Sequence, residues 1–168
     1  PWNFPAAMAT RKIGPALAAG CSVALKPAHD TPLTALAIGD ILMRAGVPDG
    51  VVNVVVTDQP SPAVHAMLES GRVRKLSFTG STRVGSLLLQ QAATRIINCS
   101  MELGGNAPLI VCSDADIDVA VDGAMLAKMR NGGAACTAAN RIYVARSISQ
   151  KFIVEFAKAM SALKMGVG

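Results

Sequence analysis

The stretch Lys75-Leu-Ser-Phe-Thr-Gly-Ser81 decides the fold class. Lys75–Thr79 is a predicted strand and Arg83–Ala93 a predicted helix, so Gly80 and Ser81 form a direct strand-to-helix corner. Such a corner exposes free backbone N–H groups at a helix N-terminus, where a phosphate group binds. Capping of the helix by Ser81 is the alternative. The corner predicts α/β structure with a candidate nucleotide site.

Short apolar runs alternate with amphipathic stretches along the rest of the chain. Further strands are predicted at Cys21–Lys26, Val51–Val56, Arg95–Met101 and Leu109–Cys112. Further helices are predicted at Ala6–Ala19, Thr34–Ala45, Pro62–Glu69, Asp116–Lys128 and Gln150–Leu163. Because the strands are apolar on both faces, they predict a doubly wound, mainly parallel sheet covered by helices, of the Rossmann type.

The composition narrows the class of protein. With 51% hydrophobic and 16% charged residues, the chain has enough apolar surface to fold as a globular unit. No apolar run reaches the roughly 20 residues of a membrane span, so we expect no membrane contact and a cytoplasmic location. The net charge of +5 comes from basic residues that are scattered along the chain, with few aromatic residues among them. This pattern favours a small anionic ligand over nucleic acid.

The four cysteines form no C-x-x-C pair and only two histidines accompany them, so neither a disulfide scaffold nor a metal site is predicted. Cys21, Cys99 and Cys112 fit ordinary buried positions. Cys136 differs, because it lies in Asn131-Gly-Gly-Ala-Ala-Cys-Thr-Ala-Ala-Asn140, where small side chains leave the sulfur approachable. It is a candidate nucleophile, with a buried structural thiol as the alternative.

Two charged residues end predicted strands. Glu102 precedes Gly104 and Gly105, which let the chain turn and bring the carboxylate over a pocket as a candidate general base. Lys26 lies at the carboxyl end of its strand, where α/β sheets bind ligands. For both residues, a solvated strand end is the alternative interpretation.

Five motifs occur in a characteristic order. They are Pro1-Trp-Asn-Phe-Pro5, Lys26-Pro-Ala28, Phe78-Thr-Gly-Ser-Thr82, Met101-Glu-Leu-Gly-Gly105 and Asn131-x-Gly-x-x-Cys136. Together they resemble the signature set of the aldehyde dehydrogenase superfamily, and the resemblance extends over the whole chain. The separations agree as well, at 23, 76 and 34 positions between Asn3, Lys26, Glu102 and Cys136.

The resemblance implies a reaction. Cys136 is expected to attack an aldehyde carbon, and Asn3 to hold the resulting oxyanion together with the Cys136 backbone N–H. Glu102 is then expected to activate the water that releases a free acid.

The resemblance also implies NADP or NAD as cofactor. Lys26 is expected to bind the adenosine ribose hydroxyls, Gly80 and Ser81 the pyrophosphate, and Leu103 the nicotinamide end. Trp2 and His29 complete the cofactor-binding residues that we expect.

Arg11 and Arg130 lie eight residues after Asn3 and six before Cys136. Arginines at these places resemble those of succinate-semialdehyde dehydrogenases, whose substrate bears a distal carboxylate that two guanidinium groups can clamp. The alternatives are a betaine or simple aliphatic aldehyde as substrate, with both arginines purely structural.

Three positions depart from the pattern of the family. Ala134 replaces the usual glutamine two residues before the nucleophile, and Ala138 stands where some relatives carry a second, regulatory cysteine. His29 replaces the glutamate with which NAD-preferring members bind the ribose 2′-hydroxyl. Because a 2′-phosphate is then not repelled, we predict that NADP is accepted and preferred.

The resemblance also predicts the domain organisation. Residues 1–105 are expected to be part of an NAD(P)-binding domain, and residues 106–168 the N-terminal part of a catalytic domain. Relatives are several-fold longer, so we expect an internal fragment that is inactive alone and a full-length homodimer or homotetramer. A non-catalytic, nucleotide-binding fragment is the competing hypothesis.

Overall fold

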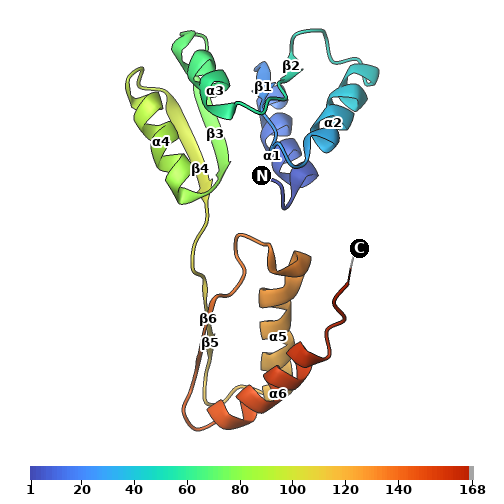
Figure 1. Cartoon of the computed structure of the whole chain (residues 1–168), viewed down its shortest axis with the longest axis vertical. Coiled ribbons are helices and arrows are strands. Elements are labelled where there is room, and N and C mark those ends of the chain that lie inside the picture. Colours follow the sequence, from blue (N-terminus) through green and yellow to red (C-terminus); the bar gives the residue numbers. More distant parts are fainter. Residues whose placement is uncertain (167–168) are drawn as a thin grey trace. The chain divides into compact units, whose positions relative to one another are not determined.

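A computed structural model describes residues 1–166 (Figure 1). The chain divides into two compact units, Pro1–Leu103 and Gly104–Gly168. This division falls two residues before the boundary expected after Gly105. The assignment of the units to a cofactor-binding and a catalytic domain stays a prediction.

The first unit alternates helices with parallel strand pairs. Its helices are α1 (Pro5–Ala18), α2 (Pro32–Arg44), α3 (Pro60–Glu69) and α4 (Thr82–Ala93). Its strands are β1 (Val23–Leu25), β2 (Val52–Val54), β3 (Lys75–Gly80) and β4 (Asn98–Leu103). A proline near the N-terminus starts α1, α2 and α3, because its missing N–H needs no acceptor there.

Two sheets form in this unit. β1 pairs with β2, and β3 pairs with β4 over six residues, from Lys75 opposite Asn98 to Gly80 opposite Leu103. Each pair is joined in sequence by a helix, α2 in the first and α4 in the second. Parallel pairing and the α/β class are therefore confirmed, while the hydrogen bonds group the strands into pairs instead of one continuous sheet.

The second unit repeats the arrangement. Its elements are β5 (Pro108–Val111), α5 (Ile117–Met129), the short 3-10 helix η1 (Arg130–Gly133), β6 (Arg141–Val144) and α6 (Ser149–Ser161). β5 and β6 pair in parallel, and α5 and α6 pack on them through a core centred on Val121, Ala124 and Phe152. Phe152 stacks on Phe156 with ring centroids 5.5 Å apart.

Two strand predictions need correction. β6 was not predicted at all, and β4 begins at Asn98 rather than Arg95. Ile96 has a positive φ of 52°, so residues 95–97 turn out of helix α4 before the strand starts. Among residues 1–166, no helix has the length and apolar character needed to cross a membrane.

Candidate functional site

Polar side chains of the first unit meet where β3 and β4 end. Thr79 lies opposite Glu102 in the register of the two strands. Lys12 reaches them from α1, and its Nζ donates a hydrogen bond to Thr79 Oγ1 at 2.5 Å. Three elements thus bring an amine, a hydroxyl and the expected general base to one end of this sheet.

Lys12 is a residue that the sequence motifs do not include. Burial lowers its pKa most, the charge of Arg11 lowers it further, and the carboxylate of Glu102 acts in the opposite direction. The amine is therefore partly removed from water and sensitive to the charge of Glu102. A signal was present in the sequence, because Lys12 follows the buried Ala9 by three positions and so lies on the buried side of α1.

Lys26 directly follows β1. Its Nζ donates to the carbonyl oxygen of Pro27 at 2.7 Å, and burial lowers its pKa. Three residues later, His29 Nε2 lies 3.0 Å from Asp30 Oδ1, with both side chains largely exposed. The loop between β1 and α2 therefore presents one lysine amine and one imidazole that is already engaged by a carboxylate.

The corner between β3 and α4 is shaped as the sequence predicts. Ser81 is the N-cap of α4, and its Oγ accepts a hydrogen bond from the Val84 N–H at 3.3 Å. The capping interpretation of Ser81 is thus realised. Capping does not use the N–H groups of Thr82 and Arg83, which in any α-helix lack an intrahelical acceptor and attract anions.

Close packing fixes the ends of β3 and β4. A Cβ at Gly80 would lie 2.5 Å from Phe78 Cζ, and a Cβ at Gly85 would lie 2.6 Å from Leu103 Cδ2. Leu103 therefore packs against α4 where the helix carries no side chain, and this contact sets the position of the carboxyl end of β4.

These residues fit an anionic dinucleotide. Lys26 and the N-terminus of α4 both follow the carboxyl ends of parallel strands, the edge at which α/β sheets bind ligands. A partly buried amine and the free N–H groups of a 12-residue helix are suited to the phosphate and ribose groups of NAD(P).

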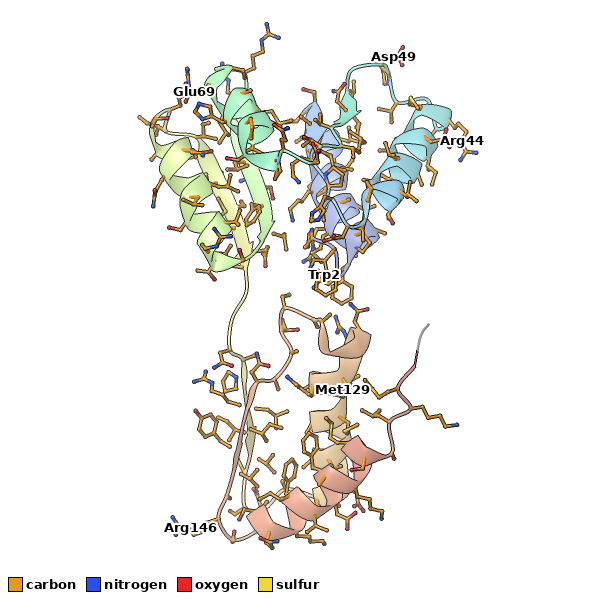
Figure 2. All side chains as sticks on the ribbon, viewed as in Figure 1. Trp2, Arg44, Asp49, Glu69, Met129 and Arg146 are labelled. Atoms are coloured by element: carbon orange, nitrogen blue, oxygen red, sulfur yellow. The ribbon has the colours of Figure 1, made fainter. Side chains whose placement is uncertain are left out.

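The other expected residues of the first unit lie around the start of α1. Trp2 is 57% exposed at the beginning of the chain (Figure 2), and Asn3 is half-buried in the turn that leads into α1. Arg11 is exposed on α1, with its Nη1 3.9 Å from Met8 Sδ.

Cys136 lies in the second unit on a tight turn. The N–H of Ala138 donates to the carbonyl oxygen of Ala135 at 3.0 Å, so Cys136 and Thr137 are the two central residues of the turn. Cys136 is exposed and is not in a disulfide. The turn presents its thiol to an incoming ligand, as an attacking nucleophile requires.

This turn is anchored on both sides. Before it, Asn131, Gly132 and Gly133 all have positive φ, which reverses the chain after α5. After it, Ala138 and Ala139 are buried, and the Ala139 N–H donates to the Ala127 carbonyl oxygen at 3.1 Å. The exposed thiol of Cys136 therefore lies on a turn whose backbone is held in place on both sides.

Arg130 ends α5, six residues before Cys136, and its side chain is exposed. It belongs to the second unit, whereas Arg11, Asn3 and Glu102 belong to the first. Their expected roles toward one substrate stay predictions.

The expectation for the other three cysteines was wrong. Cys21 and Cys112 are exposed and Cys99 is half-buried, so none is a core residue. Cys21 and Cys112 lie just outside a helix and a strand, respectively, where the chain has left the packed interior.

The sequence matches the aldehyde dehydrogenase family over residues 1–168. It is 55% identical to a succinate-semialdehyde dehydrogenase of Paenarthrobacter nicotinovorans and 52% identical to the NADP(+) succinate-semialdehyde dehydrogenase of Escherichia coli. It is also 52% identical to a glutarate-semialdehyde dehydrogenase of Pseudomonas putida. Each comparison covers 100% of this chain and 37%, 35% and 35% of the relative, respectively.

The fold agrees with these relatives. The crystal structure of succinate-semialdehyde dehydrogenase from Burkholderia pseudomallei superposes with a TM-score of 0.96 at 51% identity, covering 99% of this chain and 34% of that one. The chain therefore spans about a third of the length of the curated relatives that it matches.

Proposed function

This chain belongs to the aldehyde dehydrogenase family, and we propose that it takes part in oxidising a carboxylate-bearing aldehyde, first of all succinate semialdehyde, to the acid. The observation that carries the proposal is the exposed Cys136 thiol on an anchored turn. We propose Asn3 and Glu102 as the other catalytic residues. Because the chain spans a third of its relatives, the proposal concerns the full-length protein.

The first half of the reaction forms a thioester. The Cys136 thiolate attacks the carbonyl carbon of the aldehyde, and the carbonyl oxygen becomes an oxyanion held by the Asn3 side chain and the Cys136 N–H. The oxyanion collapses, the hydrogen on that carbon leaves with its electron pair, and a thioester remains on Cys136. NADP or NAD, when bound, accepts this hydride.

The second half releases the acid. Glu102 takes a proton from water while the water oxygen attacks the thioester carbon, and the C–S bond breaks to return the Cys136 thiolate. One aldehyde, one water and one oxidised cofactor give one carboxylate, one reduced cofactor and two protons. The carboxylate of Glu102 raises the pKa of Lys12, so the two charges lie close enough to interact.

Arg11 and Arg130 are proposed to bind the distal carboxylate of the substrate. Two relatives support this, because succinate and glutarate semialdehyde both carry a carboxylate at the far end from the aldehyde. Bidentate guanidinium–carboxylate pairs give such recognition both strength and geometry.

We propose NADP as the preferred cofactor. His29 occupies the position where NAD-preferring members carry glutamate, and the relative from Escherichia coli is named for NADP(+). The carboxylate of Asp30 next to it lies 3.0 Å from His29 Nε2.

The test is the initial rate of reduced-cofactor formation by the full-length protein. We expect kcat/KM to be higher for succinate semialdehyde than for butanal, a neutral aldehyde of equal chain length, and higher with NADP than with NAD. His29→Glu should lower the NADP-to-NAD ratio while leaving the aldehyde preference unchanged. Equal kcat/KM for the two aldehydes contradicts the substrate assignment, and a strong NAD preference contradicts the cofactor assignment.

A further inference from the structure

A basic cavity lies at the amino ends of β3 and β4, at the opposite end of these strands from Thr79 and Glu102. Its volume is about 260 Å³, and it is lined by Gly71, Val73, Arg74, Arg95, Ile96 and Ile97. β3 is six residues long, which separates the two ends by roughly 17 Å. A ligand in this cavity is therefore distinct from one bound at the carboxyl ends of the strands.

Positive charge dominates this end of the sheet. Two of the residues that line the cavity are arginines, Arg74 and Arg95, and Arg72 and Lys75 are their neighbours in sequence at the start of β3, whereas the one carboxylate that pairs with any of these four residues is Glu69, within the part of the chain that the structure describes. Arginines rarely gather without an anionic partner, because their mutual repulsion costs free energy.

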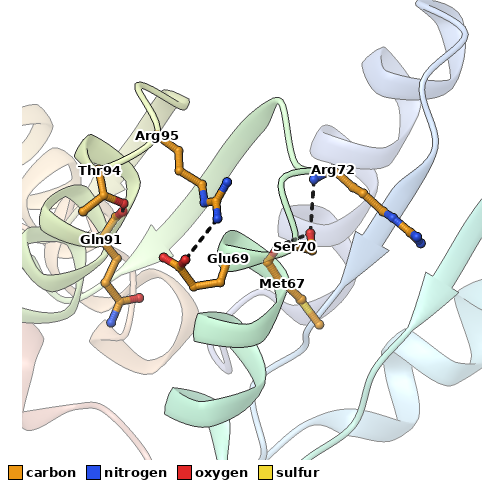
Figure 3. A network of polar contacts seen from close by, with 7 residues as sticks. All are labelled: Met67, Glu69, Ser70, Arg72, Gln91, Thr94 and Arg95. Carbon is orange, nitrogen blue, oxygen red and sulfur yellow. Dashed lines mark hydrogen bonds and ion pairs between the residues drawn. The ribbon is translucent and has the colours of Figure 1, made fainter.

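The four cations differ in how they are engaged. Lys75 Nζ donates to Asn98 Oδ1 at 2.6 Å and to Ser100 Oγ at 2.8 Å, so its amine is held on the sheet. Arg95 Nη2 lies 3.2 Å from Glu69 Oε2 (Figure 3), in a pair whose side chains are both nearly half exposed. Arg74 has no hydrogen bond or ion pair within the part of the chain that the structure describes, so its guanidinium group is available at the cavity.

The backbone on both sides of the cavity has positive φ. Gly71 has φ +70°, a common value for a glycine that follows a helix, and an added Cβ there would contact Arg95 Nη1 at 3.4 Å. Ile96 has φ +52° although it is β-branched, and its side chain is 93% exposed. A β-branched residue in the left-handed region is strained, and such strain is concentrated at functional sites.

We infer that this cavity binds a phosphate group, either as inorganic phosphate or as the phosphate of a small metabolite. Two guanidinium groups from separate segments suit its tetrahedral oxygens, and the local excess of positive charge matches its nearly doubly negative charge better than that of a single carboxylate. The exposed pair between Arg95 and Glu69 is weak enough for a phosphate to compete with the carboxylate.

Titration calorimetry of the full-length protein with inorganic phosphate tests the inference. Saturable binding is expected, and Arg74→Gln or Arg95→Gln should each weaken it by at least about tenfold, the loss of one charge-assisted hydrogen bond. Glu69→Gln removes the competing carboxylate and should tighten binding about two- to fivefold.

Two control variants locate the site. Arg44→Gln breaks a more exposed arginine–carboxylate pair, which lies within α2 with Asp40 at 3.0 Å and does not line the cavity, and should leave phosphate binding unchanged. Lys26→Met removes the amine proposed for the cofactor and should also leave it unchanged.

Several results overturn the inference. One is the absence of saturable phosphate binding, and another is unchanged affinity in both Arg74→Gln and Arg95→Gln. Loss of binding in Lys26→Met alone would place the phosphate in the cofactor site instead. Equal affinity for succinate, which carries only carboxylates, would show that the cavity does not select phosphate. Aldehyde oxidation is measured separately, so its failure leaves the result on phosphate standing.

Discussion

Lys12 shows how one side chain outside the motifs shapes the expected active site. It lies on the buried side of α1 and donates a hydrogen bond to Thr79. The charge of Glu102 on the neighbouring strand raises its pKa. Burial is the largest cause of its lowered pKa, so the folded protein disfavours the charged amine. The stability of the protein must therefore depend on pH through this residue.

The sign of that dependence follows from proton counting. The folded state releases the Lys12 proton at a lower pH than the unfolded chain, whose lysine keeps the ordinary value of 10.5. The unfolded chain then binds more protons, so the Lys12 contribution to stability rises as pH rises toward that value.

Thermal unfolding of the full-length protein between pH 8 and 10 checks this. The parent should gain stability relative to Lys12→Met as the pH rises. Lys151→Met, which removes an exposed lysine from α6, serves as the matched control and should follow the parent. A parent that loses stability relative to Lys12→Met over this range contradicts the assignment.

Arg130 allows the proposed carboxylate clamp to be tested alone. Arg130→Gln should raise KM for succinate semialdehyde about ten- to hundredfold, as the loss of a charge-assisted hydrogen bond does, and leave KM for butanal unchanged. Arg146→Gln is the matched control, because Arg146 is an exposed arginine of the same unit beyond β6 (Figure 2). An unchanged KM for succinate semialdehyde would instead favour a betaine or simple aliphatic aldehyde as substrate.

The residues of the candidate site were predictable where a motif marks them. Cys136, Glu102 and Ser81 follow from their order and spacing, and the structure adds the turn, the strand register and the helix cap that hold them. Lys12 lies in no motif, since its place depends on how α1 packs against β3. Helical spacing from Ala9 indicates only its buried side and not its partner.

At the scale of elements, the contact between α4 and β4 fixes the position of the α4 N-terminus, where we propose that the cofactor pyrophosphate binds. Gly85 is buried on α4, and Leu103 fills the space that a side chain would need. Movement of α4 away from the sheet would shift both its N-terminus and the end of β4, where Glu102 lies.

Gly85→Ala tests this contact. A new methyl group 2.6 Å from Leu103 Cδ2 must displace the leucine or the helix, so we expect a net loss of about 1 kcal/mol despite the better helix propensity of alanine. Gly14→Ala is the control, because Gly14 lies within α1 with no atom near an added Cβ, and it should stabilise by about 0.5–1 kcal/mol. Urea unfolding of both variants measures the difference, and a stabilising Gly85→Ala would contradict the close packing.

Most elements were predictable because their apolar periodicity is strong, and the errors have local causes. β6 was missed although Ile142, Tyr143 and Val144 are residues that favour strands, since a run of four residues is too short to show alternation. The start of β4 was predicted too early because Ile96 and Ile97 suggest a strand, whereas Ile96 has a positive φ and the N–H groups of both residues donate to carbonyl oxygens at the end of α4. Apolar composition alone does not reveal a positive φ.

For the whole molecule, the expected site residues are divided between two units. Asn3, Arg11 and Glu102 belong to the first unit, and Cys136 with Arg130 belongs to the second. Gly104 and Gly105 lie at the junction between them. Because the proposed reaction uses groups from both units, and because the relatives are about three times as long, we expect activity of the full-length protein and not of this chain alone.

The most direct test of the central claim is to identify the acyl group on the enzyme. In a single turnover of succinate semialdehyde with NADP, the full-length Glu102→Gln variant should form NADPH and accumulate a succinyl thioester on the peptide that contains Cys136, since hydrolysis is slowed. Cys136→Ser should form neither product at a measurable rate. NADPH formation without an acyl group on Cys136, or sustained turnover by Cys136→Ser, would contradict the account.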